Sequence, residues 1–124
     1  MNELTITIPL PDASLSPNSR SHWGKKARHT KMYRNAAMLA TKAALGRTRP
    51  PGWLKAECKV SAFYAISRRR DTDNLIASLK SAFDGIADTG VISNDSGLVH
   101  LPAIIGKDTR NPRIEITITA IPHT

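Results

Sequence analysis

Residues 54–87 read LKAECKVSAFYAISRRRDTDNLIASLKSAFDGIA, and this stretch decides the fold. Apolar and polar residues alternate through residues 54–64, which predicts a strand with one buried face. Three arginines and an Asp-Thr-Asp-Asn segment follow at residues 68–74. From residue 74 to residue 87 the apolar side chains recur at helical spacing, at Leu75, Leu79, Ala82, Phe83 and Ile86. We therefore expect a strand, a basic turn and a helix in direct succession.

The flanking sequence adds three strands and one long helix. Residues 3–9 alternate like a strand, and residues 21–45 are rich in Ala, Met and Leu, with Gly46 as a helix stop. Two further strands are expected over residues 98–105 and 114–118. The order β-α-β-α-β-β predicts an α/β (α+β) fold with a mixed sheet and two helices. The length suits one domain over residues 1–124.

The charge balance points to a polyanionic partner. The chain has 18 Lys and Arg against 10 Asp and Glu, a net charge of +8, which favours nucleic acid. No apolar run is long enough to cross a membrane, and the N-terminus does not resemble a secretory signal. The single Cys58 excludes an internal disulfide and a Cys-based zinc site, so we expect a cytoplasmic protein.

Three aspartates form the candidate chemical site. Asp71 and Asp73 stand two residues apart before the expected helix, and such close carboxylates repel each other unless a cation lies between them. Asp95 offers a third carboxylate from a loop rich in Gly and Ser. Because Mg²⁺ prefers carboxylate oxygens, we expect Asp71, Asp73 and Asp95 to bind it. The structural alternatives are a helix N-cap at Asp73, a loop residue at Asp71 and an Asx turn at Asp95.

Basic residues flank these acids. Lys80 lies about two helical turns after Asp73, so it would share that face and stabilise charge on a phosphate. The structural alternative is that Lys80 is an ordinary surface lysine. On the same face Asp84 is expected to pair with a basic group, whereas Asp88 is expected to be a solvated helix-end residue. We expect phosphates of DNA to be contacted by Lys25, Lys26, Arg28, Lys31, Arg68, Arg69 and Arg70.

Taken together, these motifs resemble the RusA family of Holliday-junction resolvases, which phages and prophages commonly encode. The resemblance is carried by DTDNL at residues 71–75, by Lys80 with AFD at residues 82–84, and by GVISND at residues 90–95. It extends to the first strand with its Pro-rich exit and to the closing Ile-Glu-Ile-Thr-Ile strand. It therefore covers nearly the whole chain.

The resemblance implies a homodimer of small α/β subunits that uses Mg²⁺ to nick two strands of a four-way DNA junction symmetrically. It implies that Asp71, Asp73 and Asp95 hold the metal and that Lys80 is catalytic. In many members the lysine stands three residues nearer the Asp-x-Asp-Asn segment, and some members carry a second acid where this chain has Asn94.

Two other interpretations remain. The first is a non-catalytic basic DNA-binding protein of the same fold. The second is a small protein that binds RNA through charge alone, for which aromatic side chains would supply stacking. The six aromatic residues form no cluster in the sequence, and most of them are expected in the core. The four histidines, at positions 22, 29, 100 and 123, show no spacing typical of metal ligands.

Overall fold

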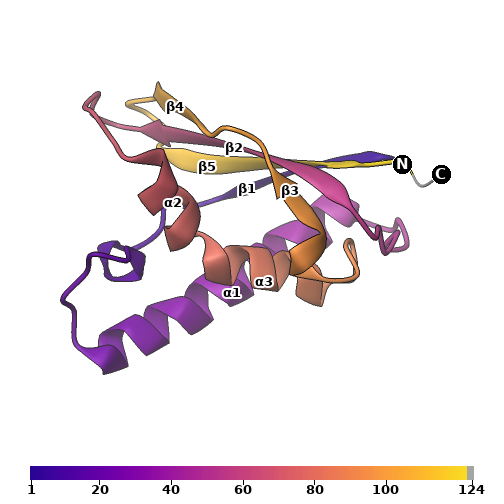
Figure 1. The fold of residues 1–124 in the computed structure, drawn as a ribbon, viewed down its shortest axis with the longest axis horizontal. Coiled ribbons are helices and arrows are strands. Elements are labelled where there is room, and N and C mark those ends of the chain that lie inside the picture. Colours follow the sequence, from indigo (N-terminus) through magenta and orange to yellow (C-terminus); the bar gives the residue numbers. More distant parts are fainter. Residues whose placement is uncertain (123–124) are drawn as a thin grey trace.

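A computed structural model describes residues 1–122, so His123 lies outside the described residues. Figure 1 shows a twisted sheet with helices against one of its faces. The elements are β1 (Glu3–Ile8), α1 (Trp23–Leu45), β2 (Ala56–Tyr64), α2 (Thr72–Ser78), α3 (Lys80–Asp88), β3 (Leu98–His100), β4 (Ile104–Lys107) and β5 (Arg113–Ala120), with 3₁₀ turns η1 (Ala13–Leu15) and η2 (Asp95–Gly97).

The sheet is mixed, as the sequence predicts. Its order is β1-β5-β2, with β3 and β4 both on the other edge of β2. β5 runs antiparallel to β1 and β2, whereas β3 and β4 run parallel to β2. The single strand expected over residues 98–105 is wrong, because β3 ends at His100, β4 begins at Ile104, and the residues between them form no strand. Pro102 interrupts the ladder there, since it has no N–H to donate.

The core lies between the sheet and the helices. Alternate residues of β1, β2 and β5 are buried, including Ile6, Val60 and Ile116. α1 and α3 lie side by side across this face (Figure 1). Gly85 permits their close approach, because a Cβ built there would lie only 2.1 Å from the carbonyl oxygen of Arg34. No described helix has the length and apolar character needed to span a bilayer.

The helix expected over residues 74–87 is two helices, so residues 1–122 contain three α-helices rather than two. α2 ends at Ser78 and α3 begins at Lys80. Leu79 between them has φ −94° and ψ 3°, and its N–H donates to the carbonyl of Ile76 in a tighter turn. All five residues of the expected apolar stripe are nevertheless buried. The periodicity therefore identified the buried face, but it did not reveal the break.

Candidate functional site

Asp71 and Asp73 stand at the N-terminus of α2. Asp71 is the N-cap, since its Oδ1 accepts the N–H groups of Asp73 at 2.9 Å and Asn74 at 3.1 Å. The capping alternative considered for Asp73 therefore applies to Asp71 instead. Asp73 lies in the first turn and is exposed. A carboxylate in that turn interacts favourably with the helix dipole.

The three arginines before α2 adjoin Asp71. Arg68, Arg69 and Arg70 line a hollow of about 430 Å³ together with Asp71. The guanidinium of Arg70 lies 3.5 Å from the ring centroid of Tyr64, in cation–π geometry. The basic run is therefore packed beside the first candidate acid, as its place in the sequence suggests.

Asp95 meets Lys80 at the start of α3. The Lys80 ammonium donates to Asp95 Oδ2 at 2.8 Å and to Asp84 Oδ1 at 3.0 Å. The hydrogen bond from the Lys80 ammonium lowers the pKa of Asp95. The pKa of Lys80 is raised because it donates to both carboxylates. The expectation that Asp84 pairs with a basic group is confirmed.

The loop that carries Asp95 is held by its neighbours. The Asn94 side chain accepts the N–H of Ser96 at 3.0 Å, so Asn94 rather than Asp95 makes the Asx turn. Gly97 follows, and a Cβ there would lie 2.2 Å from the carbonyl oxygen of Leu54. This close backbone contact fixes the loop against the entry to β2.

The expected acids thus fall into two groups. One group is Asp71 with Asp73 at α2, and the other is Asp95 with Asp84 and Lys80 at α3. Within residues 1–122 no three His, Cys, Asp or Glu side chains lie close enough together to hold a metal ion. The donor type of Asp71, Asp73 and Asp95 suits Mg²⁺, but one oxygen of Asp95 is engaged by Lys80.

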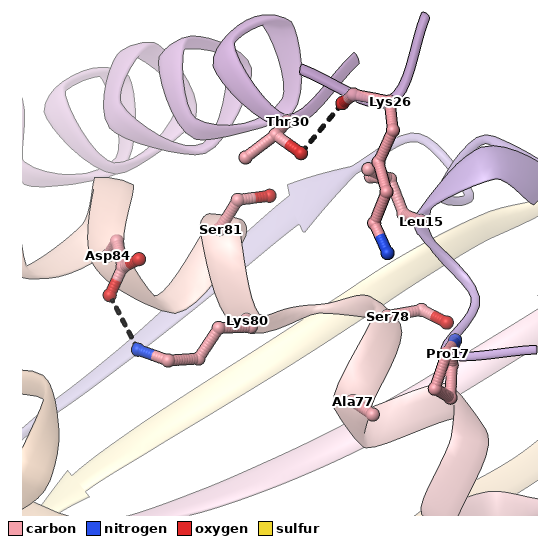
Figure 2. A pocket seen from close by; sticks show the side chains of 9 residues that line it. All are labelled: Leu15, Pro17, Lys26, Thr30, Ala77, Ser78, Lys80, Ser81 and Asp84. Atoms are coloured by element: carbon pink, nitrogen blue, oxygen red, sulfur yellow. Dashed lines mark hydrogen bonds and ion pairs between the residues drawn. The ribbon is translucent and has the colours of Figure 1, made fainter. Parts of the chain in front are cut away.

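A cavity of about 310 Å³ opens beside Lys80 (Figure 2). Lys26 and Thr30 of α1 line one side, and Ser78, Lys80, Ser81 and Asp84 line the other; Leu15, Pro17 and Ala77 complete the wall. Ser78 also lines the hollow of the three arginines, so the two depressions adjoin at that residue. The two acidic groups are therefore linked by a basic surface.

The other expected contacts of α1 are less close to this site. Lys25, Arg28 and Lys31 are exposed, and Lys31 lines a different hollow. Asp88 is not simply solvated, because it accepts two hydrogen bonds from Arg34 at 2.7 and 2.8 Å. Sequence spacing within one helix did not reveal this pair, since Arg34 lies on α1.

Trp23 is a residue that sequence reasoning missed. It begins α1 and its side chain is 77% exposed, whereas most aromatic residues were expected in the core. Its ring lies 5.4 Å from that of His22. The available signal was its place in a basic first turn, outside any apolar stripe.

Comparison with known proteins agrees with this architecture. The family model described as endodeoxyribonuclease RusA matches residues 14–119. A protein of Xylella fastidiosa (strain Temecula1 / ATCC 700964), described as uncharacterized, is 31% identical over 118 residues, which cover 94% of this chain and 76% of that relative. The chain therefore belongs to the RusA family of endodeoxyribonucleases.

Proposed function

We propose that this protein resolves Holliday junctions by paired, Mg²⁺-dependent nicks in DNA recombination and repair. Membership of the RusA family supports endonuclease activity on DNA, and junction resolution in general. The observation that carries the proposal is the contact of Lys80 with Asp95, which brings the candidate catalytic lysine to an acid fifteen residues away in sequence.

Asp71, Asp73 and Asp95 are the proposed Mg²⁺ ligands, since their oxygens match the preference of this ion. A bound Mg²⁺ lowers the pKa of coordinated water and neutralises charge on a phosphate. Lys80 is proposed to stabilise the negative charge that develops on the scissile phosphate. Its present contacts with Asp84 and Asp95 support a position near that charge.

Binding of the junction is proposed to rest on phosphate contacts rather than on base reading. The proposed contacts are Lys25, Lys26, Arg28, Lys31, Arg68, Arg69 and Arg70. The hollow lined by the three arginines and the cavity lined by Lys26 support a path for the DNA backbone between them.

Two symmetric cuts need two sites at a fixed spacing, so we propose a homodimer. We also propose a cytoplasmic location without membrane attachment, where DNA is accessible. Sedimentation equilibrium checks the first point: a mass of two chains supports it, and a monomer at working concentration opposes it.

The alternative is a non-catalytic DNA-binding protein of the same fold. The separation of Asp71 and Asp73 from Asp95 as metal donors favours this alternative. The test is incubation of a synthetic four-way junction, a linear duplex and a replication fork with the protein, with and without Mg²⁺. Paired nicks in the four-way junction with Mg²⁺ alone support the nuclease, whereas binding without any cut supports the alternative.

A further inference from the structure

We propose that the cavity between α1 and the α2–α3 break binds a backbone phosphate that neighbours the scissile one. This inference rests on the proposed function and adds to it a specific subsite. The proposed anion contacts are the Lys26 ammonium, the Ser81 hydroxyl and the first backbone N–H groups of α3.

Lys26 supplies the unpaired charge. Its side chain lines the cavity, and Figure 2 shows its ammonium directed into the space between Ser81 and Ser78. Among the described residues it has no carboxylate within ion-pair distance, in contrast to Lys80. An anion in the cavity would therefore meet a cation that is not already neutralised.

Ser81 supplies a free hydroxyl. The residue is only 7% exposed and lines the cavity, and its hydroxyl has no hydrogen-bond partner within residues 1–122. The neighbouring hydroxyls differ, because Ser78 donates to the carbonyl of Asn74 and Thr30 donates to the carbonyl of Lys26, both at 2.8 Å. The Ser81 oxygen is accessible from the cavity, so a ligand or water there can form a hydrogen bond with it.

The break at Leu79 supplies a helix N-terminus. α3 begins at Lys80 and has no side-chain cap, so its first N–H groups lack partners within the helix. Such a terminus favours a phosphate, through both its N–H groups and the helix dipole. A continuous helix would present no N-terminus at this cavity.

Asp84 is the one acidic residue in the cavity wall. Its carboxylate is held by Lys80 at 3.0 Å, which offsets its repulsion of an anion. Leu15, Pro17 and Ala77 form an apolar wall that suits the sugar next to a phosphate. The lining thus matches a phosphodiester of DNA rather than a free polar anion.

Methylphosphonate substitution tests this subsite, because it removes the charge of one phosphate at a time. A set of junctions is made, each with one methylphosphonate at a different position beside the cut. The affinity of the protein for each junction is measured by fluorescence anisotropy in EDTA, which prevents cutting. The junction modified at one of these positions should bind the unaltered protein about tenfold more weakly than the unmodified junction does, equivalent to about 1.4 kcal/mol. Lys26→Gln should weaken binding of the unmodified junction and abolish the sensitivity at that position.

Lys25→Gln is the matched control, since Lys25 is exposed, adjacent and outside the cavity lining. Lys25→Gln should modestly weaken the binding of every junction. The additional loss of affinity at the one sensitive position should remain. Ser81→Ala, which removes only the free hydroxyl, should reduce the loss at the same position. Equal sensitivity in Lys26→Gln and Lys25→Gln would overturn the phosphate subsite while leaving the nuclease intact.

A second measurement does not depend on junction binding. The dinucleotide TpT, which contains one phosphodiester, is titrated into ¹⁵N-labelled protein. The amides of Lys80, Ser81 and Ala82 should shift in the unaltered protein and in Lys25→Gln, but not in Lys26→Gln. Shifts confined to other amides, or the same shifts in Lys26→Gln, would contradict the subsite. This result does not depend on whether the protein cuts or binds junctions.

Discussion

The Lys80 ammonium lies 2.8 Å from Asp95 Oδ2 and thereby joins the first residue of α3 to the loop that follows that helix. The same ammonium contacts Asp84 one helical turn along. Because Asp95 stands fifteen residues after Lys80 in sequence, this contact brings the third candidate acid back to the α2–α3 break. The break, the loop and the two acids therefore form one unit.

Replacement of Lys80 should impair catalysis more than folding. Lys80→Gln removes the charge proposed to stabilise the transition state, so the nicking rate should fall by about 10²–10³-fold. Asp84 and Asp95 lose their shared partner, so the Mg²⁺ concentration needed for half-maximal activity should change. Lys42→Gln, in the exposed last turn of α1, is the control. An unaltered single-turnover rate in Lys80→Gln would remove this lysine from the mechanism.

The position of the loop that carries Asp95 should depend on the size of the side chain at position 97. Gly97→Ala places a methyl group against the Leu54 carbonyl, so it should destabilise the fold by about 1–3 kcal/mol and displace Asp95. Chemical unfolding and junction nicking measure the two effects. Ser96→Ala is the neighbouring control, because Ser96 is exposed and needs no backbone shift. Equal stability and activity in both variants would contradict the close contact.

The Arg34–Asp88 pair should make stability depend on pH in the acid range. Hydrogen bonds from Arg34 lower the pKa of Asp88 from its ordinary value of 3.8. A lowered folded-state pKa stabilises the protein above that ordinary value, and the stabilisation is lost as pH falls through the lowered pKa. Asp88→Asn should thus be less stable than the unaltered protein near neutral pH.

Urea unfolding at a series of pH values checks this expectation. The stability difference between the unaltered protein and Asp88→Asn should shrink as the solution is acidified below the ordinary carboxyl pKa. A difference that stays constant across the series would show that the ion pair contributes no pH dependence.

Trp23 should report DNA binding through its fluorescence. Its side chain is 77% exposed and lies one helical turn before Lys26, which lines the cavity. Junction binding should alter its solvent environment and therefore its emission. Trp23→Phe should remove most of the change, whereas Trp53→Phe should keep it, since Trp53 is half-buried beside Val91. The opposite pattern would place the DNA away from the start of α1.

The sequence predicted β1, β2 and β5 and the buried faces of these strands, because strand periodicity depends on local alternation. Ile6, Val60 and Ile116 fall on the buried face in the structure as their alternation indicates. Likewise Gly46 ends α1, with φ 57° and its N–H bonded to the Lys42 carbonyl. These features follow from neighbours a few residues apart, so no knowledge of the packing is needed.

The break at Leu79 and the partners of the site lysine could not be predicted in this way. No Pro or Gly marks residue 79, and the apolar stripe continues through it. The partners of Lys80 include an acid fifteen residues away, and Arg34 reaches Asp88 from another helix. Such contacts depend on how α1, α3 and the following loop pack together. The roles of Asp71, Asp73 and Asp95 in metal binding stay a prediction.

The most direct test of the account is Asp73→Asn, with junction binding and junction nicking measured on the same preparation. The variant keeps the size of the side chain and removes one proposed Mg²⁺ ligand at an exposed position. We expect junction affinity in EDTA at least equal to that of the unaltered protein, together with loss of nicking in Mg²⁺. Full nicking by Asp73→Asn would contradict the proposed role of this carboxylate and with it the metal-dependent mechanism.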